Sequence, residues 1–184
     1  MLIVFTGNGK GKTTAALGQA VRAVGRGRNV LMIQFIKGPW KSGEDFIEIS
    51  TKIGLSLDGE NKATGKGSFE LKKMGLGFVG ILGDKLPKEE HSKAAKEALN
   101  YFKSELCQRD VLILDEVNVA VSLGLLTAEE VLETIKDLPT EKIVLFTGRD
   151  APESFVKRAD LVTEMKEIKH PFNKKEFAKI AVEF

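Results

Sequence analysis

The chain has 184 residues, of which 42% are hydrophobic, and this composition fits one globular domain with a buried core. Its formal net charge of +2 gives no broad electrostatic surface for nucleic acid or for an anionic membrane, so we expect neither as a partner. Its single cysteine, Cys107, excludes an internal disulfide and, next to Leu106, is expected to be a half-buried, inert thiol. The N-terminal apolar run is too short for a signal peptide, and we expect a cytoplasmic protein.

Short apolar runs rich in β-branched residues predict the strands. They occupy residues 2–6, 29–36, 110–116 and 142–148. None of them alternates between apolar and polar residues, and this is typical of strands buried on both faces of a parallel sheet.

Helical patterns lie between these runs. The first has apolar residues at helical spacing, namely Leu17, Ala20, Val21 and Val24. A second covers 88–106, a capping box of Thr127 and Glu130 starts a third that runs through Leu138, and Asp150 with Pro152 and Glu153 starts a fourth. Strands that alternate with helices predict an α/β fold.

The region 50–87 differs from the rest, because it holds eight of the eighteen glycines and shows no sustained periodicity. We expect a long functional loop or lid there, with room for a short hairpin. Nothing marks a boundary to a second domain, so residues 1–184 are expected to form one domain.

The turn after the first predicted strand reads GNGKGKTT and leads into a helix, the context of a phosphate-binding P-loop. Its glycines let backbone N–H groups point at phosphate oxygens, and the helix N-terminus adds partial positive charge. Lys12 supplies a charge for the terminal phosphates, and the Thr13 hydroxyl is suited to Mg²⁺. The usual motif would have glycine where Thr6 stands, so Gly7 and Gly9 are expected to provide the flexibility.

Two acids, Asp115 and Glu116, follow the strand run VLIL, where P-loop proteins keep the carboxylates that hold Mg²⁺. In a generic ATPase the second acid could instead polarise an attacking water. The spacing alone does not decide between these roles.

Other polar residues follow strands and are expected to converge on one crevice at the carboxyl edge of the sheet. They are Gln34, Lys37, Thr147 and Arg149. Arg149 suits a phosphate clamp, although a surface arginine before a helix is the alternative. Trp40 suits either packing or a flat wall for a planar ligand. His91 is expected to be solvated, and His170 to fix the C-terminal segment.

Five blocks in the same order carry a resemblance to a known family. They read GNGKGKTTAALG, QFIKGPWKSGE, LILDEVN, TGRDAP and ADLVTEMKEIKHPF. Together they closely resemble the P-loop type of ATP:corrinoid adenosyltransferase. The resemblance implies a RecA-like P-loop NTPase fold with a mostly parallel sheet, a homodimer, and a reductase that supplies electrons. It further implies that Co(I) of a reduced corrinoid attacks the ribose 5′ carbon of ATP and releases triphosphate.

The resemblance also assigns roles to residues. The residues expected to contact ATP are Gly7, Asn8, Gly9, Lys10, Gly11, Lys12, Thr13, Thr14 and Arg149. Those expected to hold Mg²⁺ are Thr13, Glu116 and, in support, Asp115. Those expected on the corrinoid side are Gln34, Trp40 and Phe78. Catalysis is assigned to Lys12, Thr13, Glu116 and Phe78.

The chain departs from the family pattern in the block GLGFVG. It keeps Phe78, but Gly80 stands where the family usually has a tryptophan, with Phe69 and Trp40 as candidates to replace it. Two alternatives therefore stay open: a P-loop ATPase or kinase of other purpose, and a protein that binds ATP and a corrinoid without turnover.

Overall fold

The computed structural model describes residues 1–38, 40–49, 66–81, 83–171, 177, 179 and 181–182. Its centre is one six-stranded parallel sheet in the order β3-β2-β4-β5-β1-β6. The strands are β1 (Leu2–Thr6), β2 (Asn29–Gln34), β3 (Ser68–Lys73), β4 (Val111–Asp115), β5 (Ile143–Thr147) and β6 (Leu161–Glu164). The helices are α1 (Lys12–Gly25), α2 (Lys88–Glu105), α3 (Val117–Ser122), α4 (Ala128–Thr134) and α5 (Glu153–Arg158), with a 3-10 turn, η1 (Gly43–Phe46). The predicted α/β fold is confirmed.

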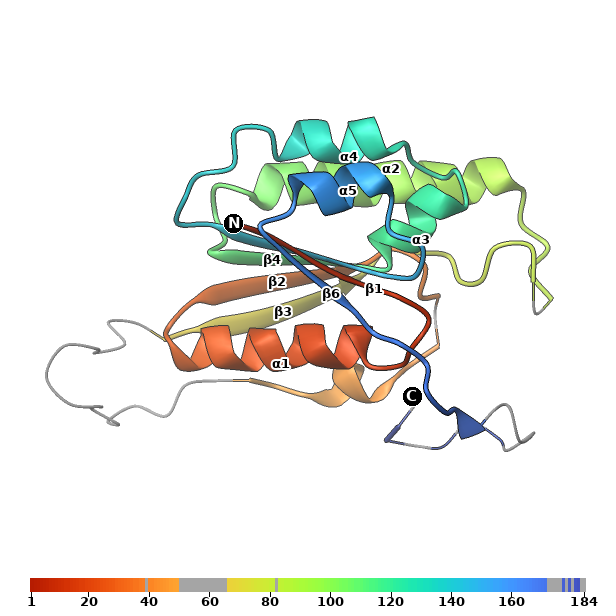
Figure 1. Cartoon of the computed structure of the whole chain (residues 1–184), viewed down its shortest axis with the longest axis horizontal. Helices are drawn as coiled ribbons and strands as arrows, with labels where there is room; N and C mark the ends of the chain where they lie inside the picture. The colour runs from red at the N-terminus through yellow and green to blue at the C-terminus, as the bar shows by residue number, and fades with distance from the viewer. Residues whose placement is uncertain are drawn as a thin grey trace, which may run out of the picture.

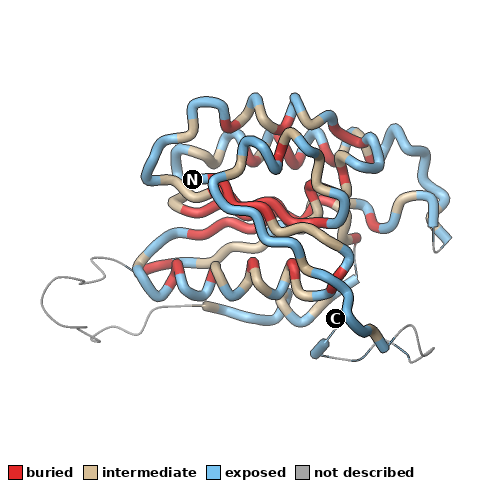
Figure 2. Tube along the Cα trace, in the orientation of Figure 1, coloured by how far each residue is buried: buried red, intermediate tan, exposed pale blue. Residues whose placement is uncertain are grey.

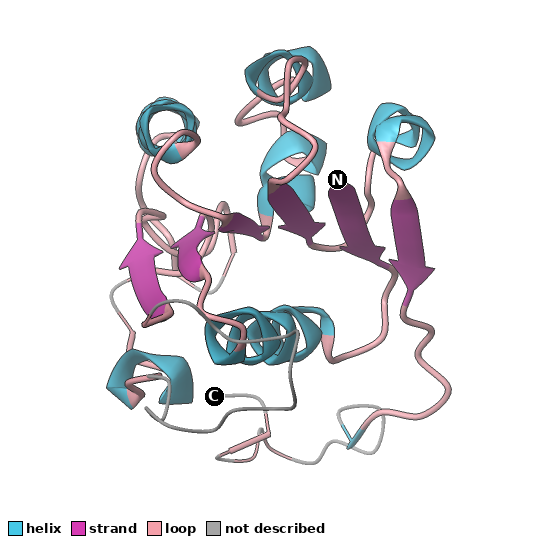
Figure 3. Ribbon diagram, turned by 90° about the vertical axis from the view of Figure 1, so that its left-hand side faces the viewer, coloured by secondary structure: helices cyan, strands magenta, loops and turns pink. Residues whose placement is uncertain are grey.

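Helices cover both faces of the sheet, which gives three layers (Figures 1 and 3). Helix α1 packs on one face, and α2, α3, α4 and α5 pack on the other. Successive strand residues serve opposite faces: Leu2 and Val4 pack with the four-helix side, whereas Ile3 packs with α1. Buried residues accordingly concentrate along the strands and the inward helix faces (Figure 2). Among the described residues, no helix is long and apolar enough to cross a membrane.

The predicted loop region 50–87 lies partly outside the described residues, which leave out 50–65 and 82. Within the described part, β3 is an edge strand that pairs parallel to β2, so these residues form no hairpin. Phe69 pairs with Val30 and packs against the α1 side of the core. It lies far from the carboxyl ends of the strands and cannot replace the missing tryptophan.

Two other expectations about side chains are wrong. His91 is 3% exposed rather than solvated, because it lies on the face of α2 that points inward. Cys107 is exposed rather than half-buried, since it follows the end of α2 in a surface turn. The helix expected to run through Leu138 ends at Thr134.

All strands run in the same direction, so their carboxyl ends meet at one edge of the sheet. The register places Gln34 of β2 beside Asp115 of β4, and the P-loop follows β1. This edge carries the residues described next.

Candidate active site

The P-loop joins β1 to α1 through backbone conformations that suit glycine. Gly7 has φ 92, and Gly11, the residue that caps α1, has φ 111. Gly9 has no such φ, but a side chain on it would come within 2.7 Å of the Met165 carbonyl oxygen. Its own N–H donates to that oxygen at 2.7 Å. Thr6 is therefore tolerated in place of the usual glycine, because the tight positions lie further along the loop.

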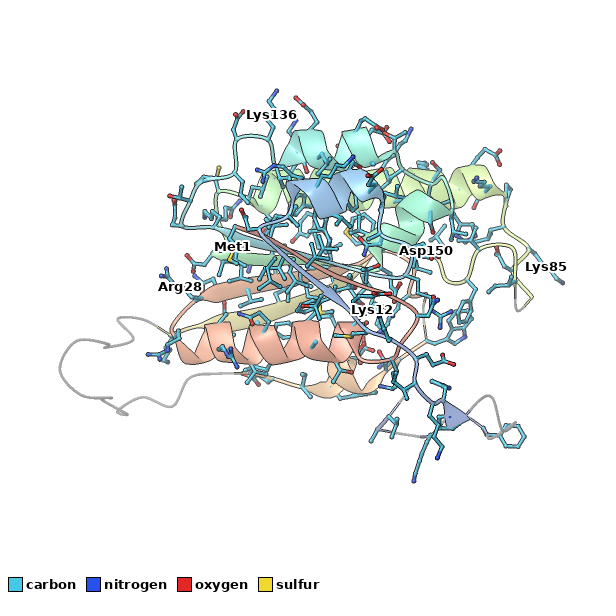
Figure 4. The ribbon with its side chains drawn as sticks, in the orientation of Figure 1. Met1, Lys12, Arg28, Lys85, Lys136 and Asp150 are labelled. Carbon is cyan, nitrogen blue, oxygen red and sulfur yellow. The ribbon has the colours of Figure 1, made fainter. Side chains whose placement is uncertain are left out.

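Lys12 is 7% exposed and folds back onto its own loop. Its Nζ donates to the carbonyl oxygens of Gly7 and Gly9, both at 2.7 Å. Burial lowers the pKa of Lys12, while the charge of Glu116 acts in the opposite direction. Figure 4 shows Lys12 at the start of α1. Its side chain and the N-terminus of that helix therefore lie at the same place. A buried cation and a helix N-terminus at one point are suited to a polyanion.

Asp115 is fully buried and accepts hydrogen bonds from side chains of three elements, α1, β2 and β5. Its Oδ1 accepts hydrogen bonds from the hydroxyls of Thr13 at 2.8 Å and Thr147 at 2.7 Å. Its Oδ2 accepts from Nε2 of Gln34 at 3.0 Å. The carboxylate thus fixes the Thr13 side chain relative to β2 and β5.

Glu116 follows β4 in a left-handed conformation, with φ 64. Burial and the neighbouring charge of Asp115 raise its pKa to about 7. Its backbone N–H donates to Thr147 Oγ1 at 3.0 Å, and its side chain lines the cleft above the P-loop. A strained backbone and a carboxylate that is costly to ionise are both typical of functional sites.

The oxygen donors of this site fit Mg²⁺. Thr13, Asp115 and Glu116 offer a hydroxyl and two carboxylates, and oxygen is the ligand that this hard cation prefers. No group of three or more His, Cys, Asp or Glu residues within the described part of the chain could hold a metal. In proteins, Mg²⁺ is commonly held by one or two carboxylates together with substrate phosphates.

A cleft of about 940 Å³ opens above these residues. Its lining includes Lys12, Lys37, Trp40, Phe78, Glu116 and Arg149, and also the predicted ATP contacts Asn8, Gly9, Lys10, Gly11, Thr13 and Thr14. His170 also reaches it. Gln34 is fully buried beneath the cleft, and Gly7 is likewise outside the lining residues that are described.

Trp40 and Phe78 form an aromatic wall of this cleft. Their ring centroids lie 5.6 Å apart with an angle of 35° between the planes. Trp40 is 61% exposed and Phe78 43% exposed, so neither is a core packing residue. Of the two roles expected for Trp40, the exposed wall agrees with this geometry.

Glu44 is a site residue that no motif in the sequence marks by itself. Burial would raise its pKa, but hydrogen bonds from Lys37 and Gln34 outweigh this effect and lower the pKa to about 2. Lys37 Nζ lies 2.5 Å from Glu44 Oε1 and 4.0 Å from Asp115 Oδ2. Glu44 therefore links the segment that carries Trp40 to the acidic site. The only signal in the sequence was its place in the block QFIKGPWKSGE.

Comparison with known proteins gives consistent results. Residues 1–184 match the family described as ATP:corrinoid adenosyltransferase BtuR/CobO/CobP. A corrinoid adenosyltransferase of Escherichia coli (strain K12) is 35% identical over 186 residues, which cover 100% of this chain and 85% of that protein. The corrinoid adenosyltransferase CobA of Salmonella typhimurium is 34% identical with the same coverage, and a corrinoid adenosyltransferase of Pseudomonas aeruginosa is 33% identical over 100% of this chain and 83% of its own length.

Proposed function

Since the chain belongs to the ATP:corrinoid adenosyltransferase family and is a corrinoid adenosyltransferase, we propose that its P-loop grips the triphosphate of ATP as a leaving group. The proposal rests above all on one observation. A single cleft has a phosphate-binding loop with Lys12 on one side and the exposed Trp40 and Phe78 rings on another. Such a cleft suits a nucleotide and a large planar partner together.

The proposed reaction makes one bond and breaks one. The electron pair of Co(I) forms a carbon–cobalt bond at the ribose 5′ carbon, and the bond from that carbon to the triphosphate oxygen breaks. The nucleophile carries no proton, so the site needs no general base.

The leaving triphosphate carries the developing charge, and cations stabilise it. Lys12, the P-loop N–H groups and Arg149 are the residues that we assign to this task. Asn8, Lys10 and Thr14 are further proposed contacts. Bound Mg²⁺, held by Thr13 and Glu116 with support from Asp115, would neutralise phosphate charge. The proton on Glu116 would be released when the carboxylate takes up that role.

The corrinoid is proposed to bind against Trp40 and Phe78. Gln34, which lies beneath the cleft, would act through its contacts with Asp115 and Glu44 rather than by touching the corrinoid. Gly80 has φ 69, a conformation that a tryptophan side chain would strain, and this is a physical reason for its replacement. Trp40 is our candidate for the second aromatic group.

One anaerobic assay tests the proposed function. The chain receives MgATP and chemically reduced cob(I)alamin, and the loss of Co(I) absorbance is followed together with the phosphate products. We expect adenosylcobalamin and inorganic triphosphate in equal amounts. Orthophosphate without adenosylcobalamin would instead indicate an ATPase, and binding without product a non-catalytic protein.

Phe78→Ala tests the corrinoid wall. If Phe78 helps to displace the lower ligand of cobalt before reduction, the variant loses activity mainly when the reaction starts from cob(II)alamin. Activity from supplied cob(I)alamin should be nearly retained. Phe69→Ala is the control for loss of an aromatic ring outside the cleft. Equal losses from both starting states would contradict the role.

A reductase partner and a cytoplasmic location stay predictions.

A further inference from the structure

His91 is a buried titratable residue that the proposed reaction does not use. It lies in α2 and is 3% exposed. Its Nε2 lies 3.0 Å from Oδ2 of Asp84. Since an ionised carboxylate only accepts hydrogen bonds, the imidazole is the donor. The pair joins α2 to the segment that carries Phe78.

Asp84 accepts hydrogen bonds from three donors, two of them backbone N–H groups of its own loop. Its Oδ2 also accepts from the backbone N–H of Gly80 at 2.8 Å, and its Oδ1 accepts from the N–H of Leu86 at 3.0 Å. The hydrogen bonds from these backbone groups lower the pKa of Asp84. The carboxylate therefore fixes Gly80, two residues after Phe78, relative to the buried face of α2.

The segment that carries Phe78, which we call the Phe78 loop (residues 74–81 and 83–84), is held at its other end by β2. The N–H groups of Met74 and Gly75 both donate to the carbonyl oxygen of Gln34, at 3.0 and 3.1 Å. Gly77 packs so closely against Gly38 and Trp40 that an added Cβ would come within 3.0 Å of the Trp40 ring. On the side of the loop after Phe78, Val79 packs on the core and the N–H of Gly80 donates to Asp84.

We propose that Asp84 and His91 are positioning residues that hold the Phe78 ring against Trp40 and so set the shape of the corrinoid side of the cleft. Neither residue lines the cleft, and both act through the loop backbone. The claim that these residues affect corrinoid binding rests on the proposed function. The claim that they hold the Phe78 ring against Trp40 does not, because it concerns the protein alone.

The single tryptophan provides a direct readout of this geometry. In the full chain labelled with 5-fluorotryptophan, ¹⁹F NMR gives one resonance, from Trp40, whose shift depends on the Phe78 ring 5.6 Å away. Phe78→Leu defines the resonance position without that ring. The difference in chemical shift between the unaltered chain and Phe78→Leu is the full effect of the ring. We expect His91→Leu and Asp84→Ala to move the resonance by roughly half of that difference or more, because the effect of one ring on the other depends on their relative orientation. His91→Gln, which keeps a donor at the same reach, should restore it.

Kinetics separate positioning from a general loss of folding. For His91→Leu we expect the KM for cob(I)alamin to rise about tenfold, the scale of one lost hydrogen bond to a charged group, while the KM for ATP changes less than about twofold. Asp160→Ala is the matched control. Asp160 also accepts from a backbone N–H, that of Leu2 at 2.7 Å, but at the opposite edge of the sheet.

Three outcomes would overturn the proposal. They are an unmoved Trp40 resonance in both folded variants, an equal displacement in Asp160→Ala, and a failure of His91→Gln to restore the resonance. If His91→Leu does not fold, Asp84→Asn takes its place, because it keeps the side-chain size and removes the charge. The same displacement of the Trp40 resonance is then expected for Asp84→Asn. A chain without any adenosyltransferase activity would overturn the proposed function and leave the ¹⁹F comparison valid.

Discussion

Lys12 combines a buried position with two hydrogen bonds to its own loop, and it faces the cleft. For Lys12→Ala we expect adenosyl transfer to fall at least about 10²-fold to 10³-fold, the range for loss of one group that stabilises a developing anion. Steady-state rates with saturating MgATP measure this. Lys136→Ala, on the far side of the helix layer in Figure 4, removes the same charge and should leave the rate unchanged. Similar losses in both variants would contradict the assignment.

Glu116 predicts a pH dependence of stability. Its pKa rises from 4.5 in the unfolded chain to about 7 in the folded one, so between these values the folded state holds a proton that the unfolded state releases. Stability from this group is therefore present below pH 4.5 and is lost as the pH rises to about 7. Glu116→Gln does not titrate, and without metal it should raise the melting temperature above pH 7 far more than near pH 5.

Thermal unfolding at the two pH values, followed by circular dichroism, checks this prediction. Glu97→Gln, at an exposed position of α2, is the control for loss of one carboxylate. A gain in melting temperature that is the same at both pH values would mean that the proton on Glu116 does not contribute.

At the scale of elements, Gly9 connects the P-loop to the chain after β6. An added Cβ would lie 2.7 Å from the Met165 carbonyl oxygen and 2.8 Å from the carbonyl group of Lys166, and backbone atoms cannot yield as a side chain can. We expect Gly9→Ala to reduce stability by about 1–3 kcal/mol through overpacking. ATP binding should weaken as well, because the loop has to shift. Urea unfolding and ATP titration measure the two effects.

Gly18 offers the matched control, since a Cβ added there meets nothing within 4 Å and it lies within α1. Gly18→Ala should raise stability by about 1 kcal/mol, because alanine favours the helix. Destabilisation by both substitutions would show that the contact at Met165 is not the cause.

The central strands were predictable, because β1, β2, β4 and β5 are continuous apolar runs covered on both faces. The edge strands were not. Strand β3, SFELKK, has only two apolar residues, and every residue of β6 is exposed, so neither is the continuous apolar run that marks a strand covered on both faces. Helix α3 was missed because VNVAVS is short and rich in β-branched residues.

The P-loop and the two acids were predictable because they follow strands whose carboxyl ends meet at one edge. Contacts such as Glu44 with Lys37 and Asp84 with His91 were not, since they depend on how loops fold across that edge. His91 illustrates the reason: it lies in a helix start rich in charged residues, KEEHSK, and the packing of α2 shows that it is on the face that points inward. Gln34 was correctly placed at the edge, but its burial beneath the cleft follows from pairing with Asp115.

At the scale of the whole molecule, we expect a homodimer. The expectation comes from the family resemblance, and it agrees with large apolar side chains that are exposed on a single chain, such as Phe46 at 71% and Ile47 at 48%. Light scattering after gel filtration should give twice the 20.2 kDa of one chain. A mass of 20.2 kDa that persists at high protein concentration would contradict the dimer.

The two hydrogen bonds from Lys12 to the carbonyl oxygens of Gly7 and Gly9 have a consequence for how a nucleotide arrives. The Lys12 ammonium group already holds the P-loop in a curved conformation. The glycines of the loop therefore do not have to be ordered when a polyphosphate binds. Binding is then an exchange of partners at one nitrogen, from two neutral carbonyls to charged oxygens. Little conformational entropy is lost in that exchange, and the free energy of the phosphate contacts remains available for affinity.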